Sequence, residues 1–278
     1  MEKFKIVVDS SADLLSLNNM PFSSAPLKII TVQEEYVDNK DLDVKEMVDM
    51  LSIYKGKSST SCPNPEDWLK AFGDAEYIFC ITISGTISGS YNTAKLAKEM
   101  YEELYDNRKV FVINSLSTGP EMKLIAEKIC ELIKEGKEYD SICKEITAYT
   151  KHTCLLFMLE SMKNLANNGR VSPIVAKAAG LLGIRVIGKA SDNGDLQPLD
   201  KCRGQEKALA DIVRRMKELG LKEGKVRIAH CFNEEATHQL KAMLRAEFSK
   251  VKIEIYKCRG LCSFYAEKGG LLVGFEKC

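Results

Sequence analysis

Short apolar runs alternate with amphipathic segments through the first half of the chain, and this pattern predicts its fold. The runs are rich in Val, Ile and Phe, which favours buried strands at residues 4–8, 27–31, 77–83 and 109–113. Between them, apolar residues recur every three or four positions, which predicts helices at 43–54, from Pro65, at about 92–105, at 121–133 and at 138–151. Strands separated by helices of this length indicate a parallel sheet covered on both faces.

The second half of the chain alternates in a similar way. Strands are predicted at 153–158, 184–188, 196–201, 225–231, 251–257 and 271–275. Helices are predicted after the first of these strands, ending at residue 167, and at 174–182, 205–219 and 234–247. The Asn193-Gly194 pair between two of these strands is a strong hairpin signal. We therefore expect two α/β domains, residues 1–150 with a mostly parallel sheet flanked by helices and residues 151–278.

Two hydroxyl-rich segments each lead into a predicted helix. In residues 60–68, Asn64 suits the N-cap and Pro65 the first helical position. In residues 83–91, glycines allow backbone N–H groups to approach a ligand closely. Helix N-termini carry unpaired N–H donors and the positive end of a dipole, so the two segments together suit a carboxylate or a phosphate. Ordinary capping of two unrelated helices is the alternative interpretation.

Charge and cysteine usage narrow the choice of partners. The 40 basic and 39 acidic residues give a net charge of +1, which offers no electrostatic basis for binding nucleic acid or an anionic membrane. No apolar run approaches the roughly 20 residues that span a bilayer, and no signal peptide is recognisable, so we expect a cytoplasmic protein without stable membrane insertion. The ten cysteines are scattered and lack metal-binding spacing, so we expect reduced thiols and no metal site.

Catalytic signatures are missing from the sequence. Residues 85–89 have the wrong spacing for a nucleophile elbow, and residues 183–190 resemble a P-loop but have Ala190 where a magnesium-binding hydroxyl is needed. No dinucleotide fingerprint is present either, so a polar receptor without base, metal or cofactor motif favours binding rather than catalysis, with no cofactor. A hydrolase or transferase that acts on a small carboxylated or phosphorylated substrate, with Ser88 or Ser61 as nucleophile, remains the alternative.

The motifs, taken in order, resemble those of the DegV family, which includes the fatty-acid-binding (FakB-type) subunits of bacterial fatty acid kinases. The resemblance runs from end to end, through residues 7–14, 60–66, 83–91, 114–115, 165–172, 198–204 and 269–275. It implies one long-chain fatty acid between the domains and a separate kinase as partner. The carboxylate would bind Thr60, Ser61 and the helix start Ser88-Gly89-Ser90. The acyl chain would occupy an apolar tunnel formed mostly by residues 151–278, for which residues 157–159 and 174–187 are candidates; ordinary core packing is the alternative for each of these residues.

Two further residues follow from the resemblance. Gly169-Arg170 is similar to the family's Gly-Arg corner near the head-group opening, where a guanidinium suits an acyl phosphate or a kinase partner. A helix C-terminal Arg without further role is the other interpretation. Many members carry a His-x-Gly-Pro-Gly type segment before the last strand; here Tyr265 lies nearest to that position. A phenol replaces one hydrogen bond but not a titrating imidazole, so presentation to a kinase, simple lipid carriage and ligand sensing all stay open.

Overall fold

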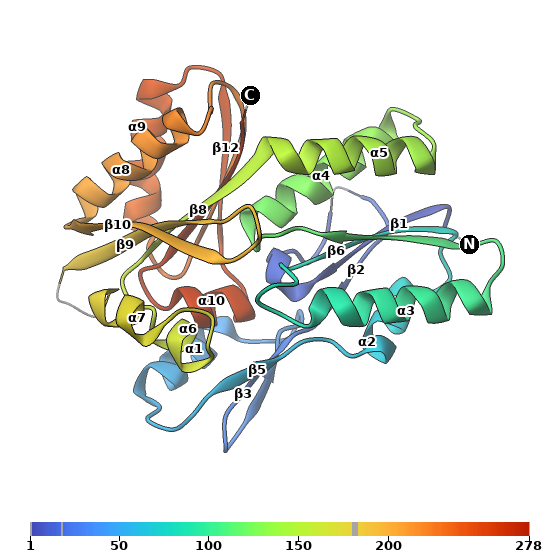
Figure 1. The fold of residues 1–278 in the computed structure, drawn as a ribbon, viewed down its shortest axis with the longest axis horizontal. Coiled ribbons are helices and arrows are strands. Elements are labelled where there is room, and N and C mark those ends of the chain that lie inside the picture. The colour runs from blue at the N-terminus through green and yellow to red at the C-terminus, as the bar shows by residue number, and fades with distance from the viewer. Residues whose placement is uncertain (1, 18, 180–182, 278) are drawn as a thin grey trace.

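The first of two large sheets is parallel and lies at the N-terminal side of the molecule. The computed structural model describes residues 2–17, 19–179 and 183–277 (Figure 1). The sheet has the order β2 (Phe22–Ala25), β1 (Phe4–Asp9), β6 (Tyr77–Thr82) and β7 (Lys109–Asn114). All of its neighbouring strands are parallel, as the alternation of strands and helices predicts. A fold with a helix-flanked parallel sheet is therefore confirmed.

Helices cover both faces of this sheet. Successive strand residues point to opposite sides, so each strand contributes apolar side chains to both layers of helices. On one face Val7, Ile78 and Cys80 pack with α2 (Pro65–Phe72) and α3 (Ser90–Leu104). On the other face Ile6 and Phe79 pack with α4 (Pro120–Lys134) and α5 (Tyr139–Tyr149). Figure 1 shows the two helix pairs above and below the strands.

The second large sheet has six strands and is mainly antiparallel. Its order is β10 (Leu196–Arg203), β9 (Ile184–Ala190), β8 (Thr153–Leu159), β13 (Leu271–Glu276), β11 (Gly224–His230) and β12 (Val251–Lys257). Only β11 and β12 are parallel neighbours. Helices α8 (Gln205–Glu218) and α9 (Glu234–Glu247) cover one face. The short helices α6 (Lys163–Asn167), α7 (Pro173–Ala179) and α10 (Gly260–Ala266) lie against the other.

A third, small sheet corrects one expectation. The segment 27–31, predicted as a strand in the run that forms the parallel sheet, becomes β3 (Lys28–Ile30) between β4 (Glu35–Val37) and β5 (Ser59–Ser61). The place in the parallel sheet belongs to β2, an edge strand whose sequence Phe-Ser-Ser-Ala gives no apolar run. Ile29, with Met47 of α1 (Val44–Ile53), packs in the same cluster as Phe157. The domain division at residue 150 stays a prediction.

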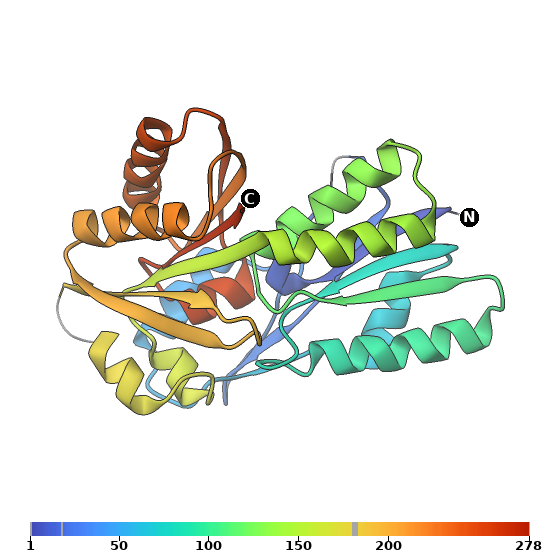
Figure 2. The same cartoon turned by 45° about the horizontal axis from the view of Figure 1, so that its top comes forward.

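Other predicted elements differ only at their ends. The predicted hairpin is confirmed as the antiparallel pair β9–β10 around Gly194, and Figure 2 shows it extending toward the first sheet. The helix predicted at 174–182 is described for Pro173–Ala179, and its last three residues lie outside the described residues. Within the part of the chain that the structure describes, no helix is long and apolar enough to cross a membrane.

Candidate functional site

A cavity lies where the two large sheets and the small sheet meet. The empty space between its walls is about 660 Å³, part of it open to solvent, and only about 60 Å³ admits the centre of a water-sized sphere, so the space is narrow. Its walls are mostly aliphatic and aromatic, with a few polar side chains: Leu27, Thr60, Ile83, Ile87, Ser88, Thr118, Leu155, Phe157, Leu159, Leu165, Arg170, Leu196, Leu261, Cys262, Tyr265, Ala266 and Leu272. An apolar cavity with few polar groups is typical of a small-molecule site.

The carboxyl end of the parallel sheet organises the loops around this cavity. Asp9, at the end of β1, is fully buried and accepts hydrogen bonds from Ile83 N at 2.8 Å and from Ser90 Oγ at 2.6 Å. Burial raises the pKa of Asp9. The hydrogen bonds that its carboxylate accepts from serine hydroxyls and backbone N–H groups lower the pKa and so offset part of this rise. Because Asp9 fixes both ends of the 83–90 loop, Ile87 and Ser88 between them are presented to the cavity.

Two hydroxyl groups meet at the polar part of the cavity. Thr60 Oγ1 of β5 and Tyr265 Oη of α10 form a hydrogen bond of 2.7 Å, although 205 positions separate them in the sequence. One hydroxyl donates to the other, so the hydrogen of the accepting hydroxyl remains available to a ligand. Burial raises the pKa of Tyr265, which keeps the phenol neutral and able to donate.

Arg170 and Ser88 supply further donors beside this pair. Arg170 Nε donates to Ile87 O at 3.1 Å and Nη1 to Asn168 O at 2.6 Å, and the guanidinium carbon lies 5.9 Å from the centre of the Tyr265 ring. Its Nη2 donates to no described residue. Ser88 Oγ accepts from the backbone N–H of Ser90 at 3.3 Å, and its own hydrogen is likewise unused among the described residues.

The structure brings four of the seven residues expected to bind a ligand to the cavity wall: Thr60, Ser88, Arg170 and Tyr265. Ser61, Gly89 and Ser90 are not among the wall residues. Ser61 follows Thr60 in β5 and therefore points to the opposite side of the strand. Gly89 occupies the N-cap of α3, close to Cys62, and Ser90 uses its hydroxyl on the buried carboxylate of Asp9.

The expected tunnel segments are divided in the same way. Phe157 and Leu159 line the cavity, whereas Met158 between them points into the core on the other face of β8. No described residue of 174–187 lines the cavity: Val175 and Ala176 pack at the edge of a core cluster, and Val186 lies inside it. Leu181 and Leu182 lie outside the described residues, so the expectation for 174–187 as a whole stays a prediction.

Helix α10 contributes wall residues that the sequence did not predict, namely Leu261, Cys262 and Ala266. Two buried carboxylates hold its first turn. Asp38 accepts from the N–H groups of Gly260 and Leu261, both at 2.9 Å, and Asp13 Oδ1 accepts from Arg259 N at 2.7 Å. A methyl group on Gly260 would lie 2.7 Å from the Asp38 carboxylate, so glycine is required for this close approach. Three backbone donors of the helix start are thereby satisfied.

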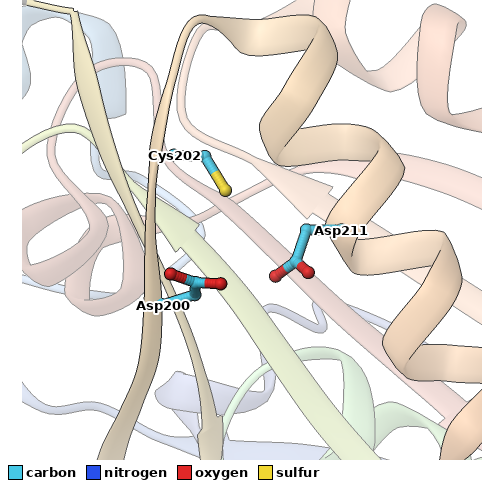
Figure 3. A group of neighbouring side chains, drawn as sticks. All are labelled: Asp200, Cys202 and Asp211. Carbon is cyan, nitrogen blue, oxygen red and sulfur yellow. The ribbon is translucent and has the colours of Figure 1, made fainter.

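A second cluster of chemically capable side chains lies away from the cavity. Asp200 and Cys202 of β10 face Asp211 of α8, with ligand atoms within 4.8 Å of one another (Figure 3). Arg215 Nε binds Asp211 Oδ2 at 2.6 Å, and Arg215 Nη2 lies 3.4 Å from Asp200 Oδ2. Burial raises the pKa of the Cys202 thiol. The group is best described as an ion-pair cluster between strand and helix.

The two serines considered as nucleophiles, Ser61 and Ser88, have no base beside them in the described part of the chain. Among the described residues, no carboxylate or imidazole forms a hydrogen bond with the hydroxyl of Ser61 or Ser88. His230, at the end of β11, is buried, and burial lowers its pKa. Its Nδ1 accepts from Asn233 N at 3.1 Å, and it does not line the cavity. A serine without a neighbouring base is a weak nucleophile.

Comparison with known proteins identifies close relatives over the whole chain. The family model "Uncharacterised protein, DegV family" matches residues 3–277. A DegV domain-containing protein of Streptococcus pneumoniae is 40% identical over 277 residues, which cover 98% of this chain and 99% of that protein. A crystal structure of a DegV family protein from Eubacterium eligens, loaded with heptadecanoic acid, is 42% identical, with a TM-score of 0.98 over 99% of this chain and 100% of the other. The Fatty Acid Kinase (Fak) B3 protein of Streptococcus pneumoniae, loaded with linoleic acid, is 40% identical, with a TM-score of 0.97 over 100% of both chains.

Proposed function

The chain belongs to the DegV family, and from this premise we propose that it binds one long-chain fatty acid in the cavity between its two large sheets. The observation that carries the proposal is the composition of the cavity wall: hydrogen-bond donors gather at Thr60, Tyr265, Ser88 and Arg170, and the rest is almost entirely apolar. Relatives about 40% identical to this chain were crystallised with C17 and C18 acids, which supports the same ligand class here.

The polar groups suit a carboxylate in particular. A carboxylate only accepts hydrogen bonds, and the wall offers three unused donors: one hydroxyl of the Thr60–Tyr265 pair, the hydroxyl of Ser88 and Nη2 of Arg170. The guanidinium also supplies the positive charge that a partly buried carboxylate needs. In this proposal Ser61, Gly89 and Ser90 act indirectly: Ser61 continues the strand that carries Thr60, and Gly89 and Ser90 hold the loop that carries Ser88.

The apolar walls provide most of the binding energy. Burying one methylene group contributes about 0.8 kcal/mol, so an acid with a C16 chain gains far more from the aliphatic walls than from its head group. The narrow space favours an extended chain in contact with both sides. Leu155, Phe157 and Leu159 of β8 form one wall, and Leu261 and Ala266 of α10 contribute to the cavity as well.

We further propose that the bound acid is presented to a separate kinase, which forms an acyl phosphate, and that the chain is not itself an enzyme. The similarity to a protein named as the B3 component of a fatty acid kinase supports this step, as does the lack of a base next to Ser88 among the described residues. Arg170 then has a second task, because its unused Nη2 and its positive charge also suit a phosphate oxygen. Such a partnership places the protein in the cytoplasm, where the kinase finds its ATP.

Mass spectrometry of the purified protein tests the proposal. Native spectra and solvent extracts of the wild type should show one C14 to C18 acid per chain. A variant with Thr60→Val and Ser88→Ala should bind added acid more weakly, because it lacks two of the hydroxyl groups at the polar part of the cavity. Ser141→Ala, which removes an exposed hydroxyl on α5, is the control and should keep the acid. An empty protein that also refuses added fatty acids would overturn the proposal and return attention to a small carboxylated or phosphorylated substrate.

A further inference from the structure

Phe157 lies on the cavity wall opposite a glycine of the neighbouring strand β9. Its partners in register are Leu272 of β13 on one side and Gly188 of β9 on the other. Gly188 has no side chain, and a methyl group there would lie 2.5 Å from ring atom Cε2 of Phe157 and nearer still to Cζ. The far edge of the ring therefore rests on the bare backbone of β9.

The ring lies where the cavity crosses a strand. Leu196, on the outer strand β10, lines the cavity, and so do Leu155, Phe157 and Leu159 of β8. Strand β9 runs between β8 and β10, yet none of its described residues is part of the wall. To reach Leu196 the cavity must pass over β9. Leu196 is in register with Ala190, and Gly188, two residues before Ala190 on the same face of the strand, leaves room beside this passage because it has no Cβ. The Phe157 ring takes up that room.

We infer that Phe157 sets the length and shape of the acyl chain that the cavity accepts. This inference rests on the proposed binding of a fatty acid. With the ring over Gly188, the space over β9 next to the passage to Leu196 is partly filled by a rigid aromatic group. Removal of the ring opens a path across β9, and each methylene that becomes buried along it improves the affinity about fourfold. A larger ring closes the same path and favours shorter acids.

The test compares the affinities of saturated acids of different length, measured by displacement of a fluorescent fatty acid. For Phe157→Ala, the affinity for the C20 acid relative to the C16 acid should rise at least tenfold over the wild-type ratio. For Phe157→Trp, the affinity for the C14 acid relative to the C16 acid should rise above the wild-type ratio. A methyl group at Gly188 would also lie 2.7 Å from the carbonyl oxygen of Gln197, so variation of Phe157 gives the cleaner result.

Leu159→Ala is the matched control, because Leu159 lines the same cavity from the same face of β8 but pairs with Val186 instead of a glycine. Its C20 to C16 ratio should change less than threefold. Phe157→Leu, which preserves more packing, should shift the ratio in the same direction as Phe157→Ala if the latter proves unstable on heating. An unchanged ratio in both variants, or an equal shift in Leu159→Ala, overturns the inference alone. A wild type that binds no fatty acid overturns the proposed function together with it.

Discussion

The carboxyl group of Asp13 makes the stability of the protein depend on pH. Asp13 is 7% exposed, its Oδ1 accepts from Arg259 N at 2.7 Å, and its Oδ2 has no hydrogen-bond partner among the described residues. Burial raises the pKa of Asp13 from its ordinary 3.8 to about 8, and the neighbouring Asp38 adds to the rise. The folded protein therefore keeps a proton on Asp13 that the unfolded chain releases.

The direction and size of the effect follow from this difference in pKa. The contribution of Asp13 to stability is fully present below pH 3.8 and is lost as the pH rises to about 8. One pH unit corresponds to about 1.4 kcal/mol, and pH 7 lies roughly three units above the lower value, so up to about 4 kcal/mol is lost by pH 7. Asn has the shape of Asp and keeps a carbonyl oxygen for Arg259 N, but it does not titrate.

Urea unfolding at several pH values measures this contribution, with the fluorescence of the single, fully buried Trp68 as the signal. The free energy of unfolding of Asp13→Asn minus that of the wild type should increase by about 1.4 kcal/mol for each pH unit between pH 5 and pH 7. Asp74→Asn, which changes an exposed carboxyl group, should follow the wild type throughout. Parallel curves for Asp13→Asn and the wild type would refute the reasoning, because Asp13 would then titrate alike in both states.

Three other predictions concern the cavity and its loops. Arg170→Ala should retain the bound acid through purification, since the apolar walls are intact, but lose kinase-dependent acyl phosphate formation; unchanged turnover would contradict the proposed role. Thr60→Val combined with Tyr265→Phe removes both hydroxyls of the pair and should weaken fatty acid binding about tenfold or more in a displacement assay, because a hydrogen bond to a charged group contributes about 1.5–3 kcal/mol; equal affinities would argue against this head-group site. Gly194→Ala should lower the midpoint of thermal unfolding more than Gly136→Ala does. Both glycines have a positive φ, of 83° and 78°, but only a methyl group at Gly194 collides with Ser84 Oγ, so equal shifts would exclude the collision.

The sequence predicted best the strands that are buried along their whole length. The run at 77–83 is apolar throughout because β6 lies in the middle of the parallel sheet, between β1 and β7. Strand β2 escaped prediction because an edge strand is only half covered and tolerates serines. Helix α10 escaped for the opposite reason: six of its seven residues are buried, so it shows no polar face and no helical period.

Some residues of the site could be predicted from local motifs, whereas others are placed by contacts with residues far away in the sequence. Thr60 and Ser88 belong to local motifs, and their places on the wall agree with what those motifs indicated. The hydroxyl of Ser90 looks equivalent in the sequence, but a carboxylate 81 positions earlier engages it. The position of Tyr265 likewise depends on Asp13 and Asp38, more than 200 positions before the helix that carries it. No periodicity or spacing within a short window contains such information.

The order of strands in the six-stranded sheet has a consequence for how the protein is made. β13 is the last of the six to be synthesised, yet it lies between β8 and β11 and forms backbone pairs with both. While a growing chain still lacks β13, β8 and β11 have no common neighbour, and Leu272 is missing from the cavity wall. A chain in which β13 has not yet paired therefore has an incomplete cavity wall, and lipid binding waits until this strand lies between β8 and β11.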